Sequence, residues 1–209
     1  MQEQIVILVH GLWMNAFALY PLQTRVGRCG FRVERFSYAT VGTGLEENAR
    51  RLGRGIEHAQ AAAIHLVGHS LGGVVALHAI ALRADPRVRR IVLMGSPVAG
   101  SAAGRSLART CPGRWMLGRS ETAWSERPSP SAPPGVEVGI IAGRLPLGLG
   151  RLLARLPSPN DGVVTVEETR VQGAKDSVLL PLNHTGLLFS ARAARQVCAF
   201  LRDGRFLED

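Results

Sequence analysis

The stretch LVGHSLGGVVA at residues 66–76 places a polar turn between two strongly apolar runs. The apolar residues before its polar turn have the character of a buried strand, and they are Ile64, Leu66 and Val67. The apolar residues after the turn follow helical spacing, and they are Val74, Val75, Leu77, Ile80 and Leu82. The stretch therefore predicts a sharp turn from a buried strand into a helix.

Similar strand patterns alternate with helical patterns on both sides of this turn. We predict strands at 4–10, 31–38, 63–69, 88–96, 136–143 and 177–182. We predict the helices between them at about 15–28, 45–60, 71–83 and 187–202. This alternation is typical of an α/β fold with a mostly parallel sheet of about six strands and helices on both faces.

The 209 residues fit a single domain spanning 1–209, because a chain of this length can bury one sizeable core. Two segments depart from the alternating pattern. Residues 101–135 mix Gly, Ser, Pro and Arg with isolated Trp115, Leu117 and Trp124, so we expect an irregular cap or loop excursion there. A smaller excursion is expected at 143–162.

Composition and charge limit the classes of partner. The chain has 46% hydrophobic and 20% charged residues, and no apolar stretch approaches the roughly 20 residues that span a bilayer. Its net charge of +9 comes from scattered arginines, since Lys175 is the one lysine among 25 basic residues. Without a nucleic-acid-binding motif, this pattern predicts no nucleic-acid partner. Peripheral contact with an anionic lipid surface fits the charge better.

The N-terminus and the cysteines favour a cytoplasmic protein. Glu3 stands where a signal peptide carries a positive charge, and the apolar run from Ile5 to Val9 is short. Cys29, Cys111 and Cys198 are odd in number, widely separated and without metal-site spacing. We therefore expect three reduced thiols, with neither a disulfide nor a structural metal.

The polar turn carries a G-x-S-x-G pattern, Gly68-His69-Ser70-Leu71-Gly72, between a predicted strand and a predicted helix. This context is typical of a turn that exposes a nucleophilic serine. We expect a strained backbone at Ser70, with Gly68 and Gly72 relieving the crowding around it.

A serine hydroxyl needs a neighbouring base, and His184 in a polar turn after the last predicted strand is the best candidate. Asp161, in the loop PSPNDG, is the candidate carboxylate that orients the imidazole. Asp176 and Glu167 are alternative acids, although Asp176 lies too near the start of a strand to reach the same edge of the sheet. The remaining histidines of the predicted strands and helices have structural interpretations: His58, His65, His69 and His78.

A negatively charged intermediate on Ser70 would need two backbone donors. The amide of Leu71 follows the serine, and the amide of Leu12 follows the first strand in VHGLW. We assign the pocket for the acyl group to six apolar residues of the loops, and ordinary packing is an equal alternative for each of them. They are Trp13, Phe17, Pro97, Trp115, Leu147 and Leu149.

Four motifs occur in order: HG at 10–11, GHSLGG at 68–73, NDG at 160–162 and NHTGLL at 183–188. With them the chain resembles the α/β-hydrolase superfamily, and within it small bacterial lipases and esterases and the GPI inositol-deacylase-like branch. The resemblance implies an α/β-hydrolase fold with a triad of Ser70, Asp161 and His184. It also implies oxyanion donors at Leu12 and Leu71, and no metal or organic cofactor.

The expected function is therefore that of a serine esterase or lipase acting on a small-molecule ester or lipid through an acyl-enzyme. An acyltransferase or a thioesterase would use the same groups. A non-catalytic lipid-binding or partner-binding protein on the same scaffold is a further alternative. The natural substrate, the acyl chain length and the oligomeric state stay open at this point.

Overall fold

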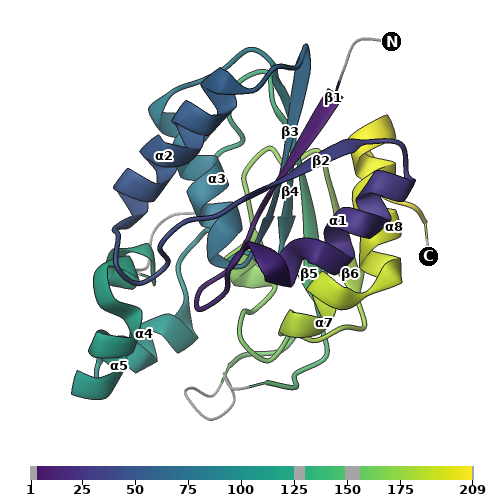
Figure 1. Cartoon of the computed structure of the whole chain (residues 1–209). Coiled ribbons are helices and arrows are strands. Elements are labelled where there is room, and N and C mark those ends of the chain that lie inside the picture. Colours follow the sequence, from purple (N-terminus) through teal and green to yellow (C-terminus); the bar gives the residue numbers. More distant parts are fainter. Residues whose placement is uncertain (1–3, 125–129, 149–155, 209) are drawn as a thin grey trace.

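The structure is a computed structural model that describes residues 4–124, 130–148 and 156–208 (Figure 1). The described residues form one six-stranded parallel sheet in the order β2-β1-β3-β4-β5-β6. Its strands are β1 (Gln4–Val9), β2 (Arg32–Phe36), β3 (Ala63–His69), β4 (Val88–Met94), β5 (Glu137–Gly143) and β6 (Asp176–Leu180). The predicted α/β class with a mostly parallel sheet is confirmed, and every predicted strand is present.

The main covering helices of the sheet are α1 (Tyr20–Arg28), α2 (Leu45–His58), α3 (Leu71–Leu82), α7 (His184–Phe189) and α8 (Ala191–Asp203). A short 3-10 helix, η1 (Ala16–Leu19), precedes α1, and η3 (Glu167–Thr169) precedes β6. The last predicted helix is divided at Ser190, whose hydroxyl accepts hydrogen bonds from the first amides of α8. None of the described helices combines the length and the apolar character that crossing a membrane requires.

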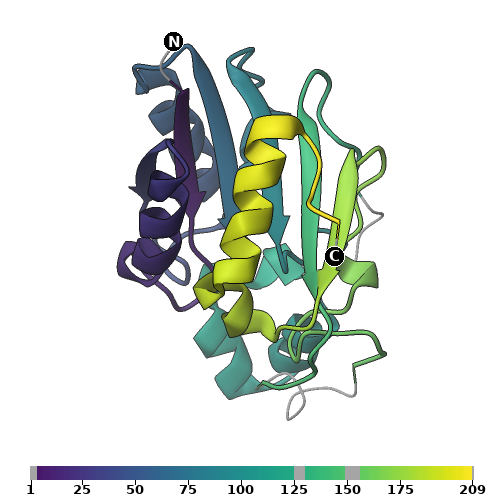
Figure 2. The same cartoon turned by 90° about the vertical axis from the view of Figure 1, so that its right-hand side faces the viewer.

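Helices cover both faces of the sheet. On β1, Ile5 and Ile7 face the core beneath α2 and α3, whereas Val6 and Leu8 face the core beneath α1 and α8. Figure 2 shows α8 lying along the strands on this second face. Because both faces of the inner strands are buried, β1, β3 and β5 are largely apolar runs, whereas the edge strand β2 (RVERF) is partly exposed. This arrangement brings the carboxyl ends of the strands, and the loops after them, to one edge.

The segment after β4 is more regular than its sequence suggests. Instead of the expected irregular stretch, residues 102–124 form α4 (Ala102–Ala108), α5 (Cys111–Leu117) and the 3-10 helix η2 (Gly118–Trp124). The hydroxyls of Ser101 and Thr110 cap the two α-helices. Helices of seven residues are too short for a clear apolar period in the sequence. They form because side chains cap their first turns and because they pack against the rest of the protein.

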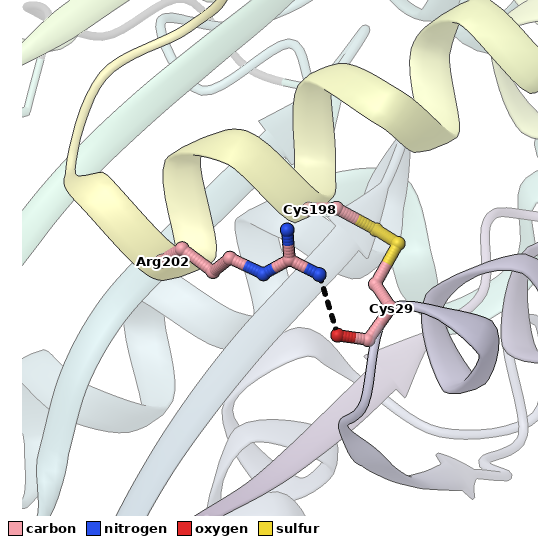
Figure 3. The surroundings of a disulfide bond; sticks show 3 residues. All are labelled: Cys29, Cys198 and Arg202. Carbon is pink, nitrogen blue, oxygen red and sulfur yellow. Dashed lines mark hydrogen bonds between the residues drawn. A yellow bond between two sulfur atoms is a disulfide. The ribbon is translucent and has the colours of Figure 1, made fainter.

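The prediction of three reduced thiols was wrong, because Cys29 and Cys198 form a disulfide (Figure 3). It joins the end of α1 to α8 across 169 residues of sequence, with a Cα–Cα distance of 6.3 Å. The Arg202 guanidinium donates a hydrogen bond of 2.6 Å to the Cys29 carbonyl beside it. Cys111, at the start of α5, is a free and exposed cysteine.

Candidate active site

Ser70 lies at the sharp turn between β3 and α3. Its backbone has φ 54° and ψ −125°, a conformation that non-glycine residues rarely adopt. The Ser70 amide donates to the Met94 carbonyl at 3.0 Å, which ties the turn to β4. A Cβ at Gly68 would lie 2.4 Å from the Gly73 Cα, and a Cβ at Gly72 would lie 2.2 Å from the Val9 carbonyl oxygen. Only glycine at both positions lets the chain hold Ser70 in this strained turn.

His184 and Asp161 form a hydrogen-bonded pair after β6 and β5. The imidazole Nδ1 lies 2.7 Å from the Asp161 Oδ2. The backbone joins the same two residues again, because the His184 amide donates to the Asp161 carbonyl at 2.9 Å. His184 is the first residue of α7, whose amides are capped by Asn183. Two hydrogen bonds therefore fix the imidazole relative to the carboxylate.

The Asp161 carboxylate is almost fully buried and is satisfied on both oxygens. While Oδ2 faces His184, Oδ1 accepts the amides of Val163 at 2.9 Å and Val164 at 2.7 Å. Such donors stabilise a buried charged carboxylate. The carboxylate is thus suited to hold a proton on Nδ1 and to leave the Nε2 of His184 for a reacting group.

His69 lies next to this pair and packs at a ring distance of 4.8 Å from His184. Its Nε2 is 3.0 Å from the His184 carbonyl. A carbonyl only accepts, so Nε2 carries the proton, and Nδ1 is buried without a hydrogen-bond partner among the described residues. Burial lowers the pKa of His69 to about 3. His69 is therefore neutral, and it anchors the backbone of His184.

The loop after β1 carries the predicted donor Leu12. The Trp13 amide donates to the Thr40 hydroxyl at 3.2 Å, and the Met14 amide donates to the Gly11 carbonyl. No residue in the described ranges accepts a hydrogen bond from the Leu12 amide. Leu12 lines the same cavity as Ser70. The second predicted donor, Leu71, is the first residue of α3, where the backbone amide has no partner within the helix.

Tyr38, which sequence reasoning did not single out, supports this loop through His10 of the HG motif. The Tyr38 hydroxyl donates to the His10 carbonyl at 2.7 Å, and the two rings stack at 4.5 Å. The Tyr38 amide donates to His10 Nε2 at 3.4 Å. Burial lowers the pKa of His10, in accord with a neutral ring. The sequence does not predict the contact between Tyr38 and His10, because Tyr38 follows β2 whereas His10 follows β1.

A cavity of about 310 Å³ opens above Ser70 and His184. Apart from these two residues and His69, its wall is largely apolar, and its apolar side chains include Leu107, Leu117, Trp124, Val163 and Val164. The wall combines the loop after β1, the helices α4, α5 and η2, and the loops before and after Asp161. The segment 101–124 thus supplies much of the wall.

The predicted pocket residues divide into two groups. Trp13 and Leu147 line the cavity, whereas Phe17 and Trp115 point into solvent, with 80% and 83% of their surface exposed. Pro97 is outside the cavity wall, and Leu149 lies outside the described residues. Phe17, Pro97 and Trp115 are therefore not part of the cavity wall in this structure. They lie on turns and short helices whose orientation only the packed structure determines.

The alternative acids lie away from His184. The Asp176 carboxylate, at the start of β6, accepts the Phe206 amide at 2.7 Å. Glu167 is paired with Arg170 at the surface. Across the parts of the chain that the structure describes, no three His, Cys, Asp or Glu side chains gather in a way that could hold a metal ion. A serine and an imidazole on one cavity, with a buried carboxylate hydrogen-bonded to the imidazole, are groups that together can transfer an acyl group.

The chain is similar to known proteins over almost its whole length. The sequence model described as "Alpha/beta hydrolase family" matches residues 6–203. No curated protein matches the sequence significantly. The solved structure of the mature lipase BlEst2 from Bacillus licheniformis is 18% identical, covers 96% of this chain and 91% of its own, and has a TM-score of 0.74.

Two other solved structures have similar folds. Carboxylesterase CesB from Bacillus subtilis is 16% identical, with coverage of 95% of this chain and 84% of its own and a TM-score of 0.62. A protein from Listeria innocua is 17% identical, with coverage of 100% and 96% and a TM-score of 0.64. At these identities the likeness is one of fold.

Proposed function

The chain belongs to the alpha/beta hydrolase family, and on this premise we propose that it hydrolyses carboxylic esters through an acyl-enzyme on Ser70. One observation carries the proposal. The imidazole of His184, held by Asp161 at 2.7 Å, lines the same apolar cavity as a serine in the strained turn between strand and helix. A structural turn alone would need neither the buried carboxylate nor the cavity.

The first half of the reaction forms the acyl-enzyme. The Ser70 hydroxyl oxygen attacks the ester carbonyl carbon while Nε2 of His184 takes its proton. Asp161 stabilises the resulting imidazolium through Nδ1. His69 stays neutral in this step, because its low pKa keeps a second positive charge away from His184. When the tetrahedral intermediate collapses, His184 gives the proton to the leaving alcohol.

The amides of Leu12 and Leu71 stabilise the negative oxygen of that intermediate. The Leu71 amide lies at the start of α3, where the helix dipole also favours negative charge. Losing one such donor typically lowers kcat about 10²- to 10³-fold. In the second half, water is the nucleophile: His184 takes a proton from it as its oxygen attacks the acyl carbon. The bond between the acyl carbon and the Ser70 oxygen then breaks, His184 returns the proton to that oxygen, and the carboxylic acid leaves.

The cavity favours an uncharged ester with an apolar acyl group. Its volume of about 310 Å³ is near the lower end of small-molecule pockets, and its wall is mainly apolar. Two structures with this fold are a lipase and a carboxylesterase by name, which agrees with an ester or lipid substrate. Closer kinship with the GPI inositol-deacylase-like branch stays a prediction from the sequence motifs.

Other uses of the same groups remain alternatives within this proposal. An acyltransferase would pass the acyl group to an alcohol or amine other than water, and a thioesterase would begin from a thioester. A non-catalytic binding protein would bind an apolar ligand in the cavity and leave Ser70 unreactive. The pairing of His184 with Asp161 favours the catalytic alternatives.

The cytoplasmic location also stays a prediction, and the Cys29–Cys198 disulfide weighs against it. Structural disulfides are typical of oxidising compartments and rare in the cytosol.

Hydrolysis of p-nitrophenyl esters from acetate to palmitate tests the proposed function. We expect turnover by the purified protein, with Ser70→Ala and His184→Ala each reduced by several orders of magnitude. Turnover of the matching thioesters, or product formed only with an added alcohol, would favour the alternatives. Unchanged turnover in Ser70→Ala would refute the acyl-enzyme on Ser70.

A further inference from the structure

Large apolar side chains are exposed to solvent on the loop after β1, on η1, on α5 and on the loop after β5. Trp115 and Phe17 are 83% and 80% exposed, and Trp13 is 49% exposed. Met116 and Leu147 are also exposed. Water-exposed tryptophan is unfavourable, and a contiguous group of such residues marks an interaction site.

Contacts link the segments that carry these residues. The Trp13 indole donates to the Met116 carbonyl at 2.9 Å, which joins the loop after β1 to α5. Trp13 and Leu147 line the same cavity. Phe17 lies in the short helix that follows Trp13, with the Arg35 guanidinium over its ring at 5.7 Å. In Figure 1 the loop after β1, α4 and α5 lie at the same end of the molecule. We call this group the mouth surface.

The charge of the mouth surface is one-sided. Residues 101–124 contain four arginines and a single acidic residue, Glu121. Of the arginines, Arg109, Arg114 and Arg119 are exposed. The neighbouring segments 11–20 and 143–148 contain no acidic residue. Several arginines elsewhere on the described surface lie in ion pairs, for example Arg50 with Glu46 and Arg170 with Glu167.

We propose that the mouth surface docks onto an anionic lipid surface, with Trp115, Phe17 and Trp13 entering the interface and the arginines contacting the headgroups. Tryptophan is favoured at such interfaces because its ring is apolar and its N–H is polar. Each arginine near an anionic surface adds to the attraction, which falls off within a Debye length. Docking in this orientation turns the cavity mouth toward the lipid.

A lipid surface fits better than the other occupants of such a patch. A second copy of the chain would bring the same positive charges against Arg109, Arg114 and Arg119, so like charges would repel. A soluble anion would satisfy the arginines and leave the exposed aromatic rings in water. An anionic bilayer satisfies both, because its headgroups are negative and its interior is apolar.

The test is sedimentation of the full chain with vesicles. The chain carries Ser70→Ala so that no lipid is consumed, and binding then reports docking apart from the proposed hydrolysis. Vesicles of phosphatidylcholine alone are compared with vesicles of equal parts phosphatidylcholine and phosphatidylglycerol. We expect binding to the anionic vesicles, weakened by salt because the charges are exposed.

Substitutions on the mouth surface are compared with matched substitutions at the opposite end. We expect Arg114→Gln to lower the vesicle partition coefficient about fivefold, which corresponds to ~1 kcal/mol, and Trp115→Ser to lower it at least as much. Arg205→Gln and Leu207→Ser are the controls. Both control residues are exposed and follow Gly204, which lies beside Glu137 and Lys175 at the start of β5 and β6. The controls should bind as well as the parent.

Three results would overturn the proposal. One is equal binding to both kinds of vesicle or to neither. Another is an equal loss in the mouth variants and the controls. The third is a concentration-dependent dimer in light scattering that Trp115→Ser abolishes, since this would identify the mouth surface as a contact between copies.

Hydrolysis of soluble p-nitrophenyl acetate is measured in parallel on the Trp115→Ser chain with Ser70 intact, and it should be unchanged.

Discussion

Nδ1 of His184 and Oδ2 of Asp161 lie 2.7 Å apart, although 23 residues separate them in sequence. The backbone repeats the connection, because the His184 amide donates to the Asp161 carbonyl. The relationship fixes both the position of the imidazole and the nitrogen that keeps its proton. Because the pair lies beside the strained Ser70 turn, its disruption should affect catalysis more than folding.

Asp161→Asn should lower kcat about 10³- to 10⁴-fold, because an amide at this position no longer holds the imidazole in the required tautomer. The substitution preserves shape, so the melting temperature should change little. The measurement is kcat on a short p-nitrophenyl ester. Asp176→Asn is the matched control and should keep full activity, since Asp176 lies at the opposite end of its strand. If both variants were equally active, Asp161 would not be the orienting acid.

Tyr38→Phe should weaken the support of the loop that carries Leu12. The variant loses the 2.7 Å hydrogen bond to the His10 carbonyl and keeps the ring that stacks on His10. We expect kcat to fall about tenfold, which is less than the 10²- to 10³-fold of a lost oxyanion donor, with KM little changed. Steady-state kinetics, which give kcat and KM separately, check this prediction. A rise in KM at constant kcat would show that Tyr38 acts on substrate binding instead.

The cavity wall should set the preferred acyl chain. Trp124 is buried in this wall, so Trp124→Leu should enlarge the cavity and raise kcat/KM for longer p-nitrophenyl esters relative to the acetate. Trp115→Leu serves as the matched control, because Trp115 points into solvent. A shift of preference in the control, or none in Trp124→Leu, would contradict this assignment of the wall.

Stability should fall in mild acid because buried histidines, His65 and His69 among them, stay uncharged in the folded protein. Burial lowers the pKa of His65 to about 4 and the pKa of His69 to about 3, against 6.5 in the unfolded chain. Below pH 6.5 the unfolded chain binds protons that the folded chain does not. The contribution of these histidines to the free energy of unfolding is therefore complete above pH 6.5. It decreases toward pH 4, by up to ~1.4 kcal/mol per pH unit for each histidine.

Urea unfolding between pH 8 and pH 5 checks this dependence. His65→Gln should reduce the slope of the free energy of unfolding against pH by up to ~1.4 kcal/mol per unit. An unaltered slope in His65→Gln would mean that His65 is already protonated in the folded protein.

Removing the Cys29–Cys198 disulfide should lower the free energy of unfolding by about 2–5 kcal/mol. The double variant Cys29→Ser, Cys198→Ser is compared with Cys111→Ser, which removes the exposed free cysteine and should have little effect. Thiol titration of the unreduced, unfolded protein should find one free thiol. Three free thiols would show that the bond does not form.

The sheet could be predicted from the sequence because its inner strands are largely apolar runs between polar turns. The runs around Val67 and Leu93 are buried on both faces, so burial leaves a direct mark on the sequence. The G-x-S-x-G turn is equally local, because the close contacts of Gly68 and Gly72 arise within a few residues or with the adjacent strand.

Features that depend on distant packing could not be predicted. Cys29 and Cys198 approach each other because α1 lies beside α8. Trp124 lines the cavity while Trp115, only nine residues earlier, faces solvent, because short capped helices turn them in different directions. The support of His10 by Tyr38 likewise depends on the order of β1 and β2 in the sheet.

The most direct test of the central claim is to identify the residue that a fluorophosphonate labels. After brief incubation of the folded protein, peptide mass spectrometry should find one adduct, on Ser70, and Ser70→Ala should remain unlabelled. Asp161→Asn should label much more slowly, since the reaction depends on the oriented imidazole. A folded protein that takes up no label, or carries it on another residue, would contradict the account of Ser70 as the nucleophile.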